Sequence, residues 1–205
     1  MTELLRNDED AFAIGVVDVP IGLSARTRLC DDAARSLLKP LRHNSVFRPP
    51  CRQTLAATTY RAAVEINKAV SIDGKGISQQ AFHIRQRIKA VDDVITAMEQ
   101  ERIREGHPEV TFAVLNENRP LIQYKKTRDG IAERLRLLAL SGVPSFDPHA
   151  TRQQLGRSLV AVDDLIDAAA MLVTARRVHT GSARCWPGPP HVERDPRGLH
   201  MAIWS

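Results

Sequence analysis

Residues 11–20 read AFAIGVVDVP, a short apolar run that ends in Asp18 and is stopped by Pro20. An apolar run of this length without polar alternation is typical of a strand that is buried on both faces. We therefore predict a strand over residues 11–19. Such a strand presents the Asp18 carboxylate at its carboxyl end, where open α/β sheets place their ligands. The alternative is an Asp that only accepts hydrogen bonds from N–H groups of the following turn.

The rest of the chain alternates between predicted helices and strands. Helical spacing and capping residues predict helices over residues 30–38, 58–70, 79–100, 108–115, 128–140 and 159–178. Residues 102–107 are a predicted strand, and residues 199–204 are predicted to form an edge strand. Strands interleaved with helices indicate an α/β fold. A length of 205 residues suits one domain over residues 1–205.

Composition narrows the class of protein. The chain has 29 Lys and Arg against 24 Asp and Glu, a net charge of +5 that suits a polyanionic partner without requiring one. The cysteines at positions 30, 51 and 185 are far apart, which favours free thiols over a disulfide or zinc framework. The acidic N-terminus does not resemble a signal peptide, and no apolar run approaches the ~20 residues of a membrane span. We expect a cytoplasmic protein with no membrane partner.

Three acidic residues open the last long helix. Asp163 and Asp167 are four residues apart and Asp164 and Asp167 are three apart, so either pair shares one helix face. The helix dipole explains acids in the first turn, namely Asp163 and Asp164. It explains Asp167 less well, because Asp167 lies further in, between Ile166 and Ala168. A carboxylate near a core requires a partner, and a metal ion is one option.

The tripeptide His107-Pro108-Glu109 follows the second predicted strand. It provides either a metal ligand or an acid that caps the next helix. A single histidine is more often a hydrogen-bonded structural residue than a ligand, so we favour a structural role for His107. For Glu109 the two interpretations are nearly balanced.

Two groups of basic residues are candidates for binding a nucleic acid. Lys125 and Lys126 precede a helix that Thr127 caps, and lysines beside helical N–H groups favour a phosphate. The loop over residues 39–53 carries Arg42, Arg48 and Arg52, which suits contact with a nucleic-acid backbone. The alternatives are a solvated basic turn and a proline-stiffened loop that packs on the sheet.

Several short motifs occur in a fixed order along the chain. They are DVPIGL at 18–23, SVFRP at 45–49, GKGISQQAF at 74–82, HPEVTF at 107–112, KKT at 125–127 with Gly130, Glu133 and Arg134, DDLIDA at 163–168, and GLHMAIW at 198–204. In their joint order and spacing these motifs resemble a bacterial family of unknown function, described as predicted nucleases with an RNase H-like (RuvC-like) fold. The resemblance runs from about residue 11 to the end.

The resemblance implies a three-layer α/β/α domain with a mixed central sheet. It also implies two divalent ions, Mg²⁺ or Mn²⁺, that activate a water and stabilise the leaving oxygen of a phosphodiester. By this resemblance Asp18 is the central-strand acid, Asp164 and Asp167 are the late-helix pair, and Asp163 is a further candidate ligand. Glu109 matches a family motif to which we assign no definite role.

One departure from the family pattern affects the expected activity. The family normally begins with a strand carrying Gly-x-Asp-Gly, whereas Asp8, Glu9 and Asp10 lie in a polar stretch. We therefore expect the first strands and the first metal ligand to be missing. A misplaced start, a fragment and a loss of catalysis are the open explanations. We also expect an exposed apolar sheet edge, which either makes the chain prone to association or is covered by a partner, such as a second copy in a homo-oligomer.

Three functions are consistent with these features. The first is a metal-dependent nuclease, inactive if the missing first-strand acid is essential. The second is a non-catalytic protein that binds nucleic acid or another partner on the same fold. The third is a metal-dependent hydrolase of a small phosphorylated compound, for which a small closed pocket is expected.

Overall fold

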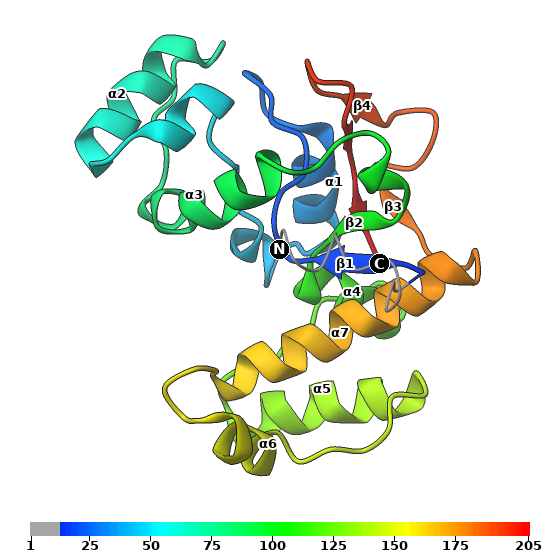
Figure 1. The fold of residues 1–205 in the computed structure, drawn as a ribbon. Helices are drawn as coiled ribbons and strands as arrows, with labels where there is room; N and C mark the ends of the chain where they lie inside the picture. Colours follow the sequence, from blue (N-terminus) through cyan, green and yellow to red (C-terminus); the bar gives the residue numbers. More distant parts are fainter. Residues whose placement is uncertain (1–12) are drawn as a thin grey trace.

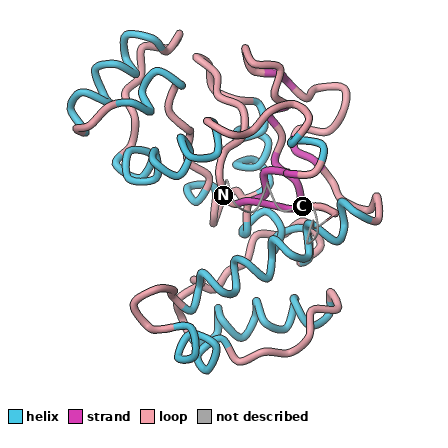
Figure 2. The backbone as a smooth tube through the Cα atoms, in the orientation of Figure 1, coloured by secondary structure: helices cyan, strands magenta, loops and turns pink. Residues whose placement is uncertain are grey.

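The computed structural model describes residues 13–205, so the first two residues of the predicted strand 11–19, and Asp8, Glu9 and Asp10, lie outside the described part. A four-stranded sheet occupies the middle of the molecule (Figure 2). Its order is β1 (Gly15–Val17), β2 (Ile103–Gly106), β6 (Ile203–Trp204), β3 (Cys185–Trp186). The first three strands are parallel, and β3 is antiparallel to β6. A separate antiparallel pair joins β4 (Glu193–Arg194) and β5 (His200–Met201).

Seven α-helices surround the sheet in the described residues. They are α1 (Leu29–Leu37), α2 (Tyr60–Val70), α3 (Gln79–Asp92), α4 (Pro108–Leu115), α5 (Arg128–Leu140), α6 (Pro148–Leu155) and α7 (Val162–His179). Figure 1 shows α7 running beside β1 and α4, with α5 and α6 on the far side of α7 and with α2 and α3 at the opposite end of the molecule. The fold is therefore mixed α/β, as the alternation of elements predicts.

The largest core cluster lies where α7 packs against α4 and α5. Ile166, Ala170 and Val173 of α7 are buried there with Phe112 of α4 and Leu138 of α5. These α7 positions recur at helical spacing, so the sequence places them on one face. Full burial of each large apolar side chain stabilises the fold by roughly 1.5–3 kcal/mol.

A glycine allows α7 to approach the sheet closely. A Cβ atom added at Gly106, the last residue of β2, would overlap the side chains of Val16 in β1 and Met171 in α7. Because Gly106 leaves this space free, α7 lies directly against β1 and β2. This contact sets the position of the acidic residues at the start of α7.

A buried ionic network joins the segment after β1 to the middle of the sheet. Arg28 donates to Asp31 at 2.5 Å and to Glu105 of β2 at 2.7 Å, and all three side chains are buried. Glu105 Oε2 also accepts from the backbone N–H of Ile21 at 2.8 Å, and Arg28 donates to the carbonyls of Ile21 and Gly22. Buried charges are tolerated only when they are paired in this way. The network therefore holds the loop that follows Asp18.

The structure differs from the predicted elements in three places. The helix predicted over 79–100 ends at Asp92, because the Arg197 side chain donates to the carbonyls of Asp92 and Ile95 and so satisfies groups that a longer helix would need. The segment predicted as one edge strand over 199–204 contains two short strands. β5 pairs with β4 in the two-stranded sheet, whereas β6 is an inner strand between β2 and β3, since the segment at Cys185 adds a strand on its outer side.

Helix α6 is the third difference, because no helix is predicted there although its start has a clear signature. Asp147 accepts hydrogen bonds from the N–H groups of His149 and Ala150, and Pro148 is the first helical residue. The three cysteines are free thiols, as predicted. Across residues 13–205 no helix combines the length and the apolar character needed to cross a bilayer.

Within the described part of the chain, β1 pairs with β2 alone. Asp18 therefore follows an edge strand of this sheet rather than a central one. That a second copy covers this edge stays a prediction.

Candidate functional site

Two parallel strands bring Asp18 and Glu109 to the same edge of the sheet. Val17 of β1 lies opposite Glu105 of β2, so the two strands end side by side. Asp18 follows the first strand, and His107-Pro108-Glu109 follows the second and starts α4. Both carboxylates therefore follow the carboxyl ends of parallel strands, where open α/β sheets place their ligands.

Asp167 of α7 joins these residues in one cavity, which we call the carboxylate cavity. The cavity has a volume of about 470 Å³, and Asp18, Glu109 and Asp167 all line it together with His107 and Lys125. Acids that are 149 residues apart in sequence therefore face a common space. The volume lies within the range of ordinary small-ligand sites.

The carboxylates of Asp18 and Asp167 are difficult to ionise where they lie. Burial raises the pKa of Asp167; the hydrogen bond and charge of Lys125 lower it, and the charges of Asp18 and Glu109 raise it again. Asp18 keeps some solvent-exposed surface. The protein packed around its carboxyl nevertheless raises the pKa of Asp18, and this effect outweighs the charges of His107 and Lys125, which lower the pKa. Such mutual repulsion favours any added cation.

Lys125 supplies one cation to this cluster. Its Nζ atom lies 2.8 Å from Asp167 and 3.2 Å from Asp163. Burial alone would lower the pKa of Lys125, but the hydrogen bonds and charges of the two carboxylates raise it above its ordinary value. The ammonium is therefore firmly charged and neutralises the acids at the start of α7.

Glu109 and His107 each have one buried polar atom without a partner. Arg134, fully buried on α5, donates to Glu109 Oε1 at 2.6 Å, and Glu109 Oε2 has no hydrogen-bond partner. His107 Nε2 lies 3.2 Å from the Ser45 carbonyl, which requires an N–H at Nε2, and Nδ1 has no partner. Buried polar atoms without partners are uncommon, and they often mark a place for a ligand or water.

The other two acids at the start of α7 have local roles. Asp163 pairs with Lys125 and lies 3.8 Å from Lys126. Asp164 is exposed, and its carboxylate accepts a hydrogen bond at 2.9 Å from the Ala161 N–H, as expected for an acid at a helix start. Asp164 also lines a shallower neighbouring hollow that Asp18 and Asp167 share.

The donor set suits a hard divalent cation only in part. Carboxylate oxygens are the ligands that Mg²⁺ prefers, and Glu109 Oε2 offers a free one. Across residues 13–205, however, no group of three or more His, Cys, Asp or Glu side chains is arranged to hold a metal ion. Mg²⁺ often binds through one or two carboxylates together with water and substrate phosphates. Asp18 and Asp167 fit that open type of site.

The predicted basic residues fall into different places. Arg42 lines the carboxylate cavity, where its guanidinium donates to the carbonyls of Leu121 and Ile122. Arg52 pairs with Asp92 at 2.8 Å and with Asp195 at 2.5 Å, so it joins α3 to the C-terminal segment. Arg48 and Lys126 are exposed.

Several residues that line the carboxylate cavity are not among those predicted from the sequence. Arg87 of α3 adds a cation, and Phe47 and Tyr124 add aromatic rings. Arg87 carries no local signal, because only the packing of α3 places it beside the ends of β1 and β2. Arg134 belongs to a recognised motif, but its role as the partner of Glu109 emerges only in the tertiary structure.

A family model described as "Protein of unknown function (DUF429)" matches residues 1–192. The chain belongs to the DUF429 family. The matched part of this DUF429 chain contains every residue of the carboxylate cavity. The resemblance to a family of unknown function is thereby confirmed. No curated protein and no solved structure matches the chain.

Proposed function

We propose that the carboxylate cavity hydrolyses a phosphodiester bond of a nucleic acid with the help of Mg²⁺ or Mn²⁺. One observation carries the proposal, which is that Asp18, Glu109 and Asp167 share one cavity at the carboxyl ends of two parallel strands. Positively charged side chains in the lining of the carboxylate cavity also support the proposal. Arg42, Arg87 and Lys125 line the same cavity and are suited to hold a phosphate beside the acids.

The protein groups have distinct tasks in this proposal. Asp18 and Asp167 bind the cation, and a bound divalent ion supplies an activated water and stabilises the leaving oxygen. Glu109, oriented by Arg134, offers its free Oε2 to the attacking water. His107, with its proton at Nε2, has a lone pair at Nδ1 that accepts a proton. Lys125 lines the same cavity and is suited to contact the phosphate as well as Asp167.

The proposed domain type is RNase H-like, with three α/β/α layers. Its support is the set of three parallel strands β1, β2 and β6, with α7 packed on β1 and β2 and with α1 in contact with β6 and β3. A late helix that brings an acid to the ends of these strands is what this class of nuclease requires.

A second candidate is binding of nucleic acid without hydrolysis on the same fold. The position of Lys125 favours it, because the ammonium already neutralises Asp163 and Asp167 without a metal ion. This candidate predicts salt-dependent binding of nucleic acid that divalent ions neither improve nor convert to cleavage.

Calorimetric titration with Mn²⁺ and cleavage of a labelled oligonucleotide test the two candidates. We expect the wild-type protein to bind Mn²⁺ and to cleave, and we expect Asp18→Asn and Asp167→Asn to lose most of both. Asp164→Asn is the matched control, because the asparagine retains the helix cap and lies outside the carboxylate cavity. Equal Mn²⁺ binding by Asp18→Asn and wild type contradicts the metal site. Cleavage that persists in Asp18→Asn contradicts the nuclease proposal.

A further inference from the structure

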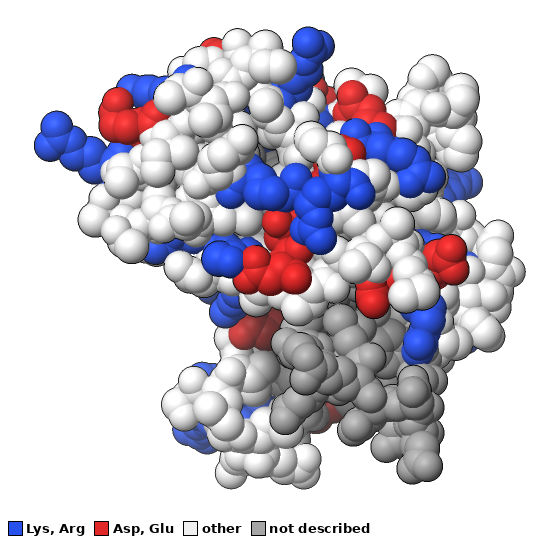
Figure 3. All heavy atoms as spheres, turned by 45° about the horizontal axis from the view of Figure 1, so that its top comes forward, with Lys and Arg blue, Asp and Glu red and all other residues white. Residues whose placement is uncertain are grey.

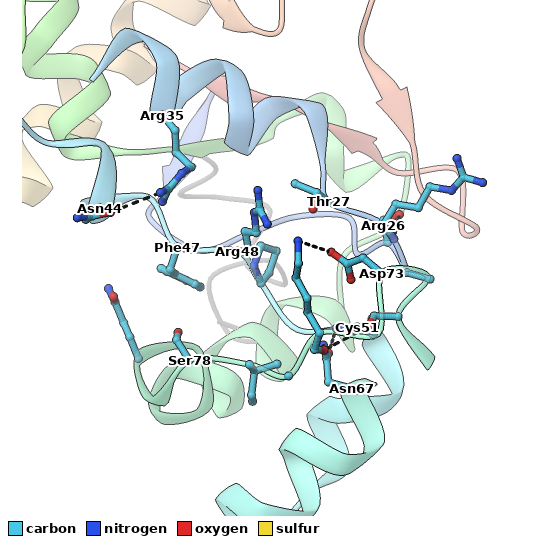
Figure 4. Close-up of a pocket in the computed structure, with 18 residues that line it drawn as sticks. Arg26, Thr27, Arg35, Asn44, Phe47, Arg48, Cys51, Asn67, Asp73 and Ser78 are labelled. Carbon is cyan, nitrogen blue, oxygen red and sulfur yellow. Dashed lines mark hydrogen bonds and ion pairs between the residues drawn. The ribbon is translucent and has the colours of Figure 1, made fainter. Parts of the chain in front are cut away.

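A second cavity lies next to the carboxylate cavity, and most of the charged side chains among its polar and apolar lining are basic. We call it the basic cavity and define it by Arg26, Arg35, Arg48 and Lys75 (Figure 4). It has a volume of about 470 Å³, and Asp73 is the single acidic residue among those lining it. Four cations around one acid leave an excess of positive charge in a concave site, which attracts anions.

The cations of the basic cavity combine a fixed group with adjustable ones. Arg35 is anchored, because its guanidinium donates to the Val46 carbonyl at 2.5 Å and to the Asn44 side chain at 3.4 Å. Arg48 lies 3.4 Å from Asp32, and both side chains are about half exposed. The Lys75 ammonium lies 3.1 Å from Asp73, and both side chains are exposed. Ion pairs in such positions are weak because solvent screens them, so an incoming phosphate can replace them.

The two cavities adjoin. Asn44, Phe47 and Gln80 line both of them, so these side chains form the boundary between the acids at the ends of β1 and β2 and the basic cavity. Phe47 lies at this boundary (Figure 4) and is half buried, since it packs against the core clusters that contain Ala81 and Leu55. Cations therefore line a cavity on either side of one aromatic residue.

We propose that the basic cavity binds the backbone of a single-stranded nucleic acid, next to a phosphodiester held in the carboxylate cavity, and that a base stacks on Phe47 between them. Grooves that hold single strands combine cations along the backbone with aromatic rings under the bases. The proposal rests on the proposed function only for the neighbouring phosphodiester in the carboxylate cavity.

The surface charge favours a single strand over a duplex. A duplex requires basic side chains over a broad face, because its phosphates lie along two strands. Figure 3 shows basic and acidic side chains interspersed on one face of the molecule rather than a continuous basic surface. The basic cavity, with four cations and one acid lining about 470 Å³, suits the backbone of one strand.

Fluorescence anisotropy tests the proposal in the presence of a chelator, without metal ions. The probes are fluorescein-labelled oligothymidylate and oligouridylate of about 12 nucleotides, a length within the usual range for such sites. We expect the double variant Arg48→Gln/Lys75→Gln to bind about tenfold more weakly than wild type at low salt. The slope of log K against log salt should decrease by roughly 0.7 for each phosphate that the variant no longer neutralises. Phe47→Leu should also weaken binding about tenfold, since it removes the stacking ring and keeps an apolar side chain.

The matched control is Arg136→Gln/Arg157→Gln, which removes two exposed cations that line neither cavity. This control should retain wild-type affinity, and thermal melting should show that all variants are folded. Equal affinity of Arg48→Gln/Lys75→Gln and wild type overturns the proposal, as does tighter binding of a duplex of the same length. Absence of binding by the wild type at low salt also overturns it.

These measurements separate the two proposals. Strand binding that depends on Arg48 and Lys75, without any Mn²⁺-dependent cleavage, supports the basic cavity and contradicts the nuclease. Cleavage that is indifferent to Arg48→Gln/Lys75→Gln supports the nuclease and contradicts the role of the basic cavity.

Discussion

The Nζ atom of Lys125 lies 2.8 Å from Oδ2 of Asp167. The charges of two other acids, Asp18 and Glu109, act on the same Asp167 carboxylate. A lysine from the loop before α5 thus occupies a position that a metal ion could take in a carboxylate cluster. The proposed divalent cation would replace the Lys125 ammonium as the positive charge beside Asp167. The first prediction depends on this exchange.

Substitution of Lys125 by Met should destabilise the fold by about 1–3 kcal/mol at pH 7, because Asp163 and Asp167 lose their partner. Urea unfolding measures the loss. Millimolar Mn²⁺ should restore part of the stability of this variant, since the cation replaces the ammonium. Lys126→Met is the control, because Lys126 is exposed and 3.8 Å from Asp163, and its effect should stay within about 0.5 kcal/mol. Equal losses in the two variants would show that the Lys125 pair contributes nothing specific.

The raised pKa values of Asp18 and Asp167 predict a pH dependence of stability. Between the ordinary pKa of 3.8 and the raised folded value, the native state holds more protons than the unfolded state, so these two groups lower stability as pH rises. Asp18→Asn removes one of them. The variant should therefore gain stability over wild type as the pH increases from about 4 to about 7. The gain should be below about 1 kcal/mol, because the exposed surface of Asp18 is screened.

Urea midpoints measured across this pH range test the prediction as a difference between variant and wild type. The difference is the informative quantity, since other groups such as Asp195, whose pKa is lowered, add their own pH dependence at the acid end of the range. A loss of stability in Asp18→Asn that grows with pH would contradict a raised pKa of Asp18.

Substitution of Gly106 by Ala should destabilise the protein by about 1–3 kcal/mol, because the added methyl group overlaps Val16 and Met171. The displacement of α7 should also weaken Mn²⁺ binding, if Asp167 binds the ion. Thermal unfolding and calorimetric titration measure the two effects. Gly188→Ala is the control, since a Cβ atom there comes no closer than 4.0 Å to a neighbouring atom outside the adjacent residues. A stable Gly106→Ala variant would show that α7 does not require this close contact.

Substitution of Arg28 by Met should cost about 3–5 kcal/mol, because it leaves Asp31 and Glu105 buried without a counter-charge. Glu105→Gln should cost less, since an amide oxygen at the Oε2 position still accepts from Arg28 Nη1 and from the Ile21 N–H, and only the hydrogen bond from Arg28 Nη2 is lost. Chemical unfolding of both variants measures which of them loses more stability. Arg48→Met, which removes an exposed arginine, is the control for the loss of a cation. A smaller effect for Arg28→Met than for Glu105→Gln would contradict this account of the network.

Predictions from short-range patterns agree best with the structure. The helices predicted over residues 108–115 and 128–140 match α4 and α5, because a first-turn proline or a capping threonine marks each start. The apolar run before Asp18 is a strand, shortened to Gly15–Val17 in the described residues. Of the acids expected at the site, Asp18, Glu109 and Asp167 share one cavity, whereas Asp163 and Asp164 do not line it. The mixed α/β class follows from the same patterns.

Local patterns therefore account for the type of most elements, for the free thiols, and for the acids at the carboxyl ends of strands and on α7. These features depend on neighbours within about one or two helical turns. Three others arise from long-range packing, namely that Lys125 pairs with Asp167, that Arg197 ends α3, and that β6 lies inside the sheet. The partners in these cases are far apart in the chain, and packing of whole elements brings them together. No local pattern carries that information, because the contacts exist only after the core has formed.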